Sequence, residues 1–354
     1  MAPYQQSEYI NEVTALAQLP LPWEKLQGSC ILITGACGMI GSYMVDTLLA
    51  ANSLHHLEMS VLAVGRSEEK ARTRFGHYWN RPDFRFLEGD VNKPLPAVRE
   101  SIDYIFHAAS NTHPVAYATD PIGTICTNIL GTHHLLQMAT THACKRFVFA
   151  STVEIYGENR GDCEQFTEDY CGYIDCNTLR AGYPESKRAG EALCQAYLKQ
   201  AGVDVVIPRL PRVFGPTLLQ TDTKALSQFI RKAIAKEDIV LKSAGTQFFS
   251  YIYVADAVYG ILYTLLHGER GQAYNIADPQ SDISLRHLAE KIASMAGQKV
   301  VFDLPNATEL AGFSKATKAA MNSSKLRALG WKPLVSLDEG LRRTLRLLSF
   351  ADKS

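Results

Sequence analysis

The chain of 354 residues is longer than one ordinary domain and shorter than three, so we expect two domains or one domain with an appended lobe. Its 36 Lys and Arg balance its 36 Asp and Glu, which excludes the bulk charge attraction of a general nucleic-acid or membrane-surface binder. No stretch is apolar for long enough to cross a bilayer, and residues 1–8 lack the basic start and apolar core of a secretory signal. We therefore expect a cytoplasmic protein with neither a nucleic-acid nor a membrane partner.

Eight cysteines are scattered along the chain, and none forms a CxxC pair. Cys163, Cys171 and Cys176 lie near one another in sequence, but they lack the spacing of paired metal ligands and have no histidine close by. We predict free thiols and no metal site.

Short apolar runs alternate with helical patterns after an N-terminal extension, residues 1–27. The extension carries one helical pattern at 11–19, which two prolines end. Strand-like runs then lie at 30–34, 61–64, 84–87, 104–106, 147–150 and 203–207, and helical patterns between them lie at 42–51, 122–143 and 185–201. Continuous apolar strands that alternate with helices predict a parallel sheet covered on both faces.

The pattern changes after Arg209. Helices are expected at 225–235, 285–296 and 337–348, whereas the runs at 252–254 and 273–276 are typical of late strands of the same sheet. We predict an α/β fold, a doubly wound parallel sheet with a smaller C-terminal substrate-binding lobe. The sheet domain takes residues 28–208 and 245–277, and the lobe takes residues 209–244 and 278–354.

Three glycines in the pattern GxxGxxG separate the first predicted strand from the helix after it. The segment consists of Gly35, Cys37, Gly38, Met39, Ile40 and Gly41, with Ala36 after the first glycine. Glycines at such a turn let the backbone approach a pyrophosphate, and the amides of the helix N-terminus face that anion. The segment predicts a dinucleotide site, with a glycine-rich structural turn as the alternative.

The end of the second strand bears on the choice of dinucleotide. An acidic residue usually binds the adenosine ribose there, but this chain has Arg66 and Ser67. Arginine suits a 2′-phosphate, and the serine hydroxyl can add a hydrogen bond. In the alternative, Arg66 is solvated and Glu68 or Glu69 binds the ribose. The cofactor is therefore NAD or NADP.

Polar and small residues follow the next two strands. Asp90 and Val91 follow the third strand, where a carboxylate can accept a hydrogen bond from the adenine amine. Ala108, Ala109 and Ser110 follow the fourth strand, where small residues let the chain pass close to the cofactor. We assign all five to cofactor binding.

Tyr183 and Lys187 lie four residues apart on a predicted helix, and so share one face. A lysine ammonium beside a phenol lowers its pKa, which lets the phenolate take an alcohol proton while hydride leaves for nicotinamide. The pair predicts oxidation of an alcohol.

Together these motifs resemble the extended short-chain dehydrogenases/reductases of the NAD-dependent epimerase/dehydratase family, which act on nucleotide-sugars. The resemblance runs from about residue 31 to residue 348, and the pattern is nearest to that of the UDP-glucuronate decarboxylases. It shows in the segments 120–128, 154–158, 183–188 and 213–216. It implies a Rossmann-type sheet domain with a substrate lobe, and a tightly bound NAD or NADP that is reduced and usually reoxidised in one turnover. We expect a homodimer and a nucleotide-sugar or related small-molecule substrate.

The resemblance also implies residue roles. Tyr183 is the base, Lys187 activates it and binds the nicotinamide ribose, and Thr152 is a second hydrogen-bond partner of the substrate hydroxyl. Asn128 joins the cofactor-binding residues. Glu154 is expected to remove a proton made acidic by a neighbouring ketone, with a purely structural carboxylate as the alternative.

Three positions depart from the family pattern. Val153 stands where sugar 4,6-dehydratases carry an acid, so dehydration is disfavoured. Phe249 replaces an arginine that binds the diphosphate, and Arg212 replaces an asparagine before the Phe-Gly-Pro turn. We predict that Arg212 takes over the phosphate contact and that Phe249 packs on a sugar or base. In the alternative, Arg212 pairs with a surface carboxylate and the substrate carries no diphosphate.

The expected reaction is oxidation at C4 of a sugar to a 4-keto intermediate, followed by epimerisation or decarboxylation and reduction of the carbonyl. The alternatives are an NADP(H)-dependent ketone or sugar reductase, and a catalytically silent dinucleotide-sensing protein. An intact set of Thr152, Tyr183 and Lys187 argues against the sensor. His113 and the pair at 133–134 are further candidates for catalysis, but we expect the pair to be packing or surface residues.

Overall fold

A single eight-stranded sheet forms the centre of the computed structural model, which describes residues 2–112, 114–303 and 317–351. The strands are β1 (Cys30–Thr34), β2 (Ser60–Gly65), β3 (Phe84–Glu88), β4 (Tyr104–His107), β5 (Arg146–Phe149), β6 (Ser151–Thr152), β7 (Val205–Leu210) and β11 (Ala273–Asn275). Their order is β11-β7-β5-β4-β1-β2-β3, with β6 beside β7, and every pair is parallel. The predicted doubly wound fold is confirmed.

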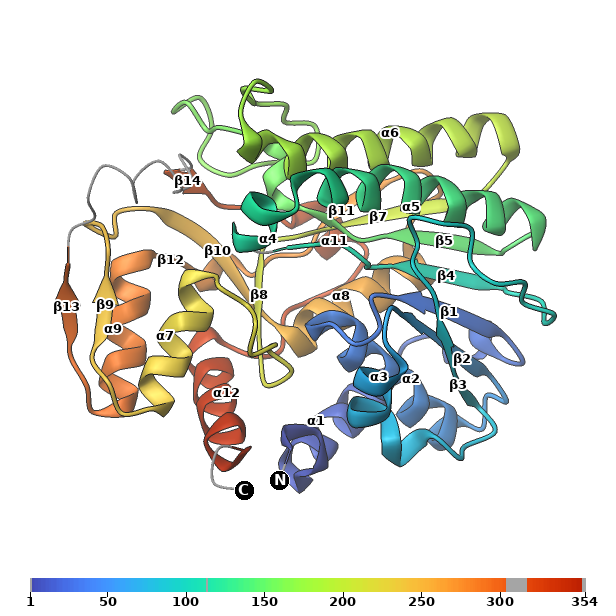
Figure 1. The fold of residues 1–354 in the computed structure, drawn as a ribbon, viewed down its shortest axis with the longest axis horizontal. Helices are drawn as coiled ribbons and strands as arrows, with labels where there is room; N and C mark the ends of the chain where they lie inside the picture. Colours follow the sequence, from blue (N-terminus) through green and yellow to red (C-terminus); the bar gives the residue numbers. More distant parts are fainter. Residues whose placement is uncertain (1, 113, 304–316, 352–354) are drawn as a thin grey trace.

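Helices cover both faces of this sheet (Figure 1). One layer holds α4 (Pro114–Thr119), α5 (Pro121–Thr141) and α6 (Gly182–Ala201); the other holds α2 (Met39–His55), α3 (Glu68–Phe75) and α8 (Val254–His267). The strand order reverses between β1 and β4, where the chain leaves neighbouring strands in opposite directions. Ligands of open α/β sheets bind at such a switch point, outside the carboxyl ends of the strands.

The C-terminal lobe has its own sheet. It contains β8 (Arg212–Phe214), β10 (Phe248–Tyr253), β12 (Asp282–Ser284) and β14 (Lys318–Ala319), while β9 (Ile239–Leu241) pairs with β13 (Val300–Phe302). Its helices are α7 (Ala225–Ile234), α9 (Leu285–Ala296), α11 (Ser324–Ala328) and α12 (Leu337–Ala351). The prediction that 252–254 belongs to the main sheet is wrong, because β10 pairs with β8, β12 and β14, and Val254 begins α8. A short apolar run indicates a buried strand, but it does not determine which strand pairs with it.

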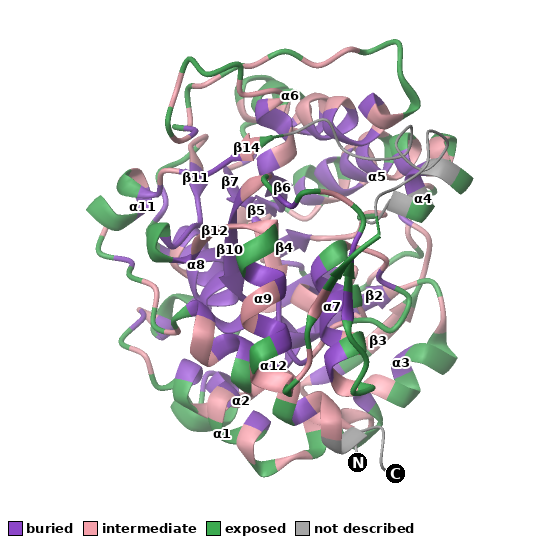
Figure 2. Cartoon of the chain, turned by 90° about the vertical axis from the view of Figure 1, so that its left-hand side faces the viewer, coloured by how far each residue is buried: buried purple, intermediate pink, exposed green. Residues whose placement is uncertain are grey.

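The N-terminal extension packs against both the sheet domain and the lobe. It contains two 3₁₀ turns, Pro3–Gln5 and Trp23–Leu26, and the helix α1 (Ser7–Ala17). On α1, the buried Glu12 carboxylate accepts hydrogen bonds from the Tyr43 and Tyr253 hydroxyls and from Arg343. Figure 2 shows buried residues concentrated in the strands and in the inward faces of the helices. Across the described residues, no helix has both the length and the apolarity needed to cross a membrane.

Candidate active site

The glycine segment forms a tight backbone turn between β1 and α2. A Cβ atom on Gly41 would lie 2.3 Å from the Gly35 carbonyl oxygen, and one on Gly35, whose φ is +66°, would lie 2.8 Å from the Ala108 backbone. Gly38 is the N-cap of α2, which begins at Met39. The turn has room only for glycine and directs helix amides outward, so these residues fit the pyrophosphate of a dinucleotide. Cys37, Met39 and Ile40 lie half-buried around it.

The predicted ribose-binding residues after β2 separate in the structure. Arg66 is exposed. The Ser67 hydroxyl accepts a hydrogen bond from the Lys70 amide at 3.2 Å as the N-cap of α3, and so is already engaged in its own helix. Glu68, one of the two alternative ribose ligands, forms an ion pair with Arg72 at 2.6 Å.

The residues after β3 are held by local contacts. The Asp90 carboxylate accepts a hydrogen bond from the Asn92 amide at 3.0 Å. Val91 is buried against α5, where a Cβ on Gly131 would lie 2.8 Å from its methyl group. β3 is the edge strand of the sheet, and the contact of Val91 with α5 shows that the chain after β3 turns back toward the helices that follow β4.

The segment after β4 is connected to the helix that carries Tyr183. Ala108 and Ala109 pass beneath the glycine turn. The next residue, Ser110, donates a hydrogen bond to the fully buried Asn128 on α5 at 2.8 Å, and Asn128 donates to Ser186 on α6 at 2.9 Å. Asn128 thus links the cofactor-side loop to α6.

Thr152, Tyr183 and Lys187 are brought together at the carboxyl end of the sheet. Thr152 ends β6, while Tyr183 and Lys187 lie on α6, and all three side chains are buried. The Lys187 ammonium donates to the Ala150 carbonyl at 2.8 Å and lies 4.7 Å from the centre of the Phe149 ring. Burial lowers the pKa of Lys187 to about 8.

The acidity of Tyr183 differs from the sequence prediction. Burial raises its pKa, the negative charge of Glu154 raises it further, and a hydrogen bond with Thr152 and the charge of Arg180 lower it. The predicted lowering by Lys187 is not what this structure shows, because its ammonium is directed to the Ala150 carbonyl. Spacing along a helix placed the two residues on one face but could not show where the ammonium points.

Arg180 and Tyr117 belong to this site but were not found from the sequence. Arg180 forms an ion pair with Glu154 at 2.5 Å and lies 4.8 Å from the centre of the Tyr117 ring. Tyr117 stacks on Tyr183 with ring centres 4.9 Å apart. The sequence offered a weak signal only, a cation three residues before the tyrosine of the helical pair. The Tyr183 phenol, predicted to be catalytic, therefore lies next to a stacked arginine and a paired carboxylate.

Arg212 and Phe249 contact each other in the lobe. The Arg212 guanidinium lies 3.4 Å from the centre of the buried Phe249 ring, so that face of the ring is closed to a sugar or base. Burial lowers the pKa of Arg212, and the charges of Glu154 and Arg180 also act on it, so it faces the same site. The alternative, a surface carboxylate partner, is not found among the described residues.

Two guanidinium nitrogens at this site have no hydrogen-bond partner among the residues that the structure describes. Nη1 of Arg180 and Nη1 of Arg212 are both buried, and within the described part of the chain nothing accepts a hydrogen bond from either. A buried N–H of a charged group left unpaired costs about 1–3 kcal/mol or more. Both nitrogens are therefore suited to an anionic group of a ligand.

The remaining candidates have structural contacts. His133 is hydrogen-bonded to Tyr197 at 3.0 Å and His134 to the Val91 carbonyl at 2.9 Å, whereas His113 lies outside the described residues. All eight cysteines are free thiols. Where the structure describes the chain, no group of His, Cys, Asp or Glu side chains could hold a metal ion.

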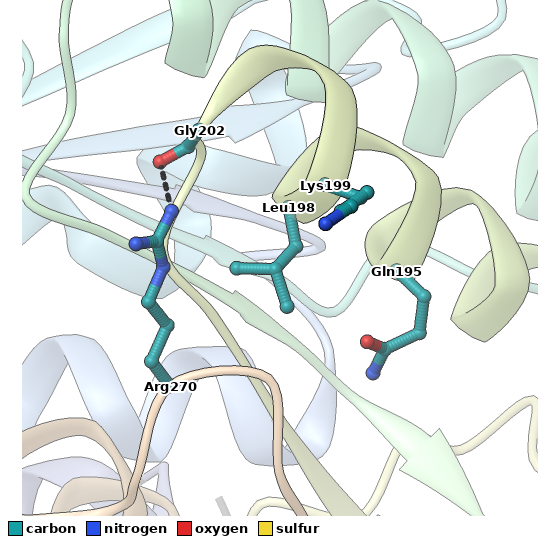
Figure 3. Close-up of a pocket in the computed structure, with 5 residues that line it drawn as sticks. All are labelled: Gln195, Leu198, Lys199, Gly202 and Arg270. Carbon is teal, nitrogen blue, oxygen red and sulfur yellow. Dashed lines mark hydrogen bonds between the residues drawn. The ribbon is translucent and has the colours of Figure 1, made fainter.

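A separate hollow of about 550 Å³ lies at the C-terminal end of α6 (Figure 3). Its lining consists of Gln195, Leu198, Lys199, Gly202 and Arg270, and the Arg270 guanidinium donates to the Gly202 carbonyl at 2.6 Å. Tyr183 lies at the opposite end of this 20-residue helix, so the hollow is not part of the candidate active site.

Comparison with known proteins decides the family. Residues 31–277 match the model of the NAD dependent epimerase/dehydratase family. The chain belongs to this family. It is 31% identical over 317 residues to UDP-glucuronic acid decarboxylase 1 of Xenopus tropicalis, covering 89% of this chain and 71% of the relative. It is also 31% identical over 311 residues to UDP-glucuronic acid decarboxylase 6 of Arabidopsis thaliana, covering 88% and 86%.

Solved structures share the fold of this family member. DesIV, a dTDP-glucose 4,6-dehydratase from Streptomyces venezuelae solved with NAD and TYD bound, superposes with a TM-score of 0.79 at 25% identity, over 92% of this chain and 98% of that one. A UDP-glucuronic acid 4-epimerase from Bacillus cereus superposes with a TM-score of 0.76 at 22% identity, over 91% and 99%, which shows the fold alone. The family predicted from the motifs is confirmed.

Proposed function

We propose that this epimerase/dehydratase-family enzyme oxidises C4 of a nucleotide-activated uronic acid and decarboxylates the resulting 4-keto sugar. Tyr183 takes the proton of the C4 hydroxyl, and Thr152 holds that hydroxyl and the phenol in one hydrogen-bonded line. Lys187 binds the nicotinamide ribose, and it stabilises the phenolate once its ammonium turns from the Ala150 carbonyl. A bound dinucleotide would supply the acceptor for the C4 hydride and its donor in the final reduction.

The observation that carries the uronic acid is the unpaired Nη1 of Arg180. This nitrogen is buried, and its guanidinium lies against the Tyr117 ring that stacks on Tyr183. A carboxylate on the sugar carbon next to C4 would come within reach of it and would supply the missing acceptor. Arg180 would then orient the substrate carboxylate beside the base.

Decarboxylation suits the remaining residues better than epimerisation at the carbon next to the ketone. A 4-keto uronic acid is a β-keto acid, so carbon dioxide leaves without a protein base, and the enolate that remains takes a proton from water at C5 before the carbonyl is reduced. Epimerisation at that carbon needs a free base, but the Glu154 carboxylate is held in its ion pair with Arg180. Val153 supplies no acid for dehydration. Glu154 therefore holds Arg180 in place in this mechanism.

The diphosphate of the substrate is assigned to Arg212. Its Nη1 is buried without a partner among the described residues, and Phe249 supports the flat face of its guanidinium. Charge-assisted hydrogen bonds to phosphate are among the strong ones in proteins. This supports the proposal that Arg212 replaces the family arginine missing at Phe249.

We propose that the enzyme binds NADP as well as NAD, and that it binds the dinucleotide tightly. Glu68 is paired with Arg72, so the charged side chains that remain for the ribose are the exposed Arg66 and Glu69, and Arg66 would suit a 2′-phosphate. The homodimer is supported by apolar side chains on the outer face of α5, where Ile122 is 75% and Leu130 is 44% exposed. Location in the cytoplasm stays a prediction from the sequence.

A substrate panel tests the proposed function. UDP-glucuronate should release carbon dioxide, whereas UDP-glucose should at most reduce the bound cofactor. Arg180→Met should lower turnover of the uronate by about tenfold to a hundredfold, because it removes a charge-assisted contact of about 1.5–3 kcal/mol. The matched control is Arg160→Met, which should leave turnover unchanged. Arg160 is an exposed cation that lies on the Tyr173 ring.

Other outcomes of the panel lead to the alternatives. If no carbon dioxide is released and uronate and neutral nucleotide-sugars reduce the cofactor equally, the uronic acid proposal is wrong. Stoichiometric consumption of NADPH with a ketone would indicate the reductase. Tight dinucleotide binding without any turnover would indicate the sensor.

A further inference from the structure

Glu191 lies on α6, one turn after Lys187, and the mechanism above does not use it. Its side chain is only 13% exposed. Oε1 accepts a hydrogen bond from the Ser151 hydroxyl at 2.5 Å and from Nε of Arg209 at 3.0 Å, while Oε2 accepts from Nη2 of Arg209 at 2.6 Å. A bidentate arginine contact and a hydroxyl together fix this carboxylate in one position.

These partners connect the two elements that carry the catalytic groups. Ser151 directly precedes Thr152 on β6, and it lies opposite Arg209 in the pairing of β6 with β7. Arg209 is itself held by the Tyr156 hydroxyl at 3.0 Å and the Glu168 carbonyl at 2.6 Å. A rigid network therefore runs from α6 through one carboxylate to the strand of Thr152.

The same carboxylate acts on the charge of Lys187. Burial lowers the pKa of Lys187 to about 8, and the negative charge of Glu191, followed by Cys194, opposes this lowering. Across the sheet, His107 on β4 is uncharged near neutrality because burial and the charge of Lys187 lower its pKa to about 3. The Phe149 ring and the Ala150 carbonyl complete the surroundings of the ammonium.

We propose that Glu191 is a positioning residue that ties β6 to α6 through Ser151 and holds a negative charge toward the Lys187 ammonium. Thr152 and Tyr183 are thereby kept at a fixed separation, and Lys187 stays charged around neutral pH. The inference rests on the proposed function, because it concerns the hydride-transfer step. Since a lysine is charged below its pKa, the rate of that step should fall as the pH rises through about 8.

The charge is tested by Glu191→Gln. Single-turnover reduction of the cofactor by UDP-glucuronate is followed against pH by absorbance. We expect the alkaline limb of the variant to move to lower pH by about one unit, the scale of losing a nearby opposite charge. The matched control is Glu185→Gln on the same helix, whose carboxylate faces Arg188 at 3.3 Å. The control should leave the limb in place, and an unmoved limb in Glu191→Gln overturns the electrostatic part.

Ser151→Ala tests the hydrogen bond through which Glu191 connects β6 to α6. This variant removes the hydroxyl but keeps the charge of Glu191. We expect hydride transfer about tenfold slower at every pH, from poorer alignment of Thr152 with Tyr183, and an unmoved alkaline limb. A parent-like rate overturns the tie. If Glu191→Gln does not fold, Glu191→Asp still decides the charge, because withdrawing the carboxylate by one methylene shifts the limb in the same direction by less, and an unmoved limb counts against it.

Dinucleotide affinity gives a readout that needs no turnover. NADH is titrated by fluorescence against pH. As the pH rises, the affinity for NADH should begin to fall at a lower pH in Glu191→Gln than in the parent, because Lys187 loses its charge earlier. A parent that reduces no cofactor with any nucleotide-sugar overturns the proposed function and leaves this titration to test Glu191. Identical titration curves in parent and variant overturn the role of Glu191 toward Lys187.

Discussion

The proposed cofactor side and the proposed substrate side of this enzyme differ in what forms them: backbone forms the first, and side chains form the second. On the cofactor side the backbone forms the site: glycines at 35, 38 and 41 turn so tightly that a Cβ at position 41 would lie 2.3 Å from a carbonyl oxygen. On the substrate side single long side chains form the site, and Arg180 and Arg212 each keep a buried nitrogen unpaired among the described residues. A backbone site tolerates little change, whereas a side-chain site can move its cation from one strand to another and still bind an anion.

The largest effect should come from the chemical step, where both sides meet. Tyr183→Phe keeps the ring that stacks on Tyr117 but loses the hydroxyl, so folding and dinucleotide binding should persist. Turnover should fall by about 100-fold or more, the usual scale for a general base. Rapid mixing with substrate, followed by absorbance of the reduced cofactor, measures it. A variant that reduces its cofactor as fast as the parent removes Tyr183 from the mechanism.

Gly41→Ala tests whether the tight backbone turn determines the affinity for the dinucleotide. The new methyl group would overlap the Gly35 carbonyl, so the turn must open. Overpacking of this kind costs about 1–3 kcal/mol, which corresponds to about 5- to 150-fold in dinucleotide affinity if the whole cost falls on the bound state. Titration by NADH fluorescence measures the change. The control is Gly76→Ala, where an added Cβ meets no atom within 4 Å.

This contrast explains what the sequence could predict. The first strand, Cys30–Thr34, and the lobe helix at 285–296 were predicted to the residue, because apolar periodicity and glycine spacing are local signals. The sheet of β10 was assigned wrongly, because strand pairing depends on distant partners. Arg180 was missed, because its role depends on Glu154 and Tyr117, which lie far from it in sequence. Side-chain direction, such as that of Lys187, also needed the structure.

Arg212→Ala tests whether a single side chain binds the diphosphate of the substrate. Removing the guanidinium should weaken UDP binding by about tenfold or more, the scale of one charge-assisted contact. Isothermal titration with UDP measures this, and NADH affinity should stay at the parent value because Arg212 lies in the lobe. Undiminished UDP binding would contradict the phosphate contact. If the parent binds no nucleoside diphosphate, the substrate lies outside the nucleotide-sugars.

The smallest effect is expected at Arg66, where a side chain, and not the backbone, would determine the preference between NADP and NAD. Arg66 is exposed, so its contact with a 2′-phosphate would be that of a surface ion pair, about 0.2–1 kcal/mol. Arg66→Ala should therefore weaken NADPH binding by no more than about fivefold and leave NADH binding unchanged, because only NADPH carries the phosphate. Arg85→Ala is the control, since Arg85 is an exposed cation on β3 that is paired with Glu100. Unchanged affinity for both dinucleotides would place Arg66 in solvent, whereas equal weakening would indicate a contact other than the 2′-phosphate. In either case the ribose would be left to Glu69 or to the backbone.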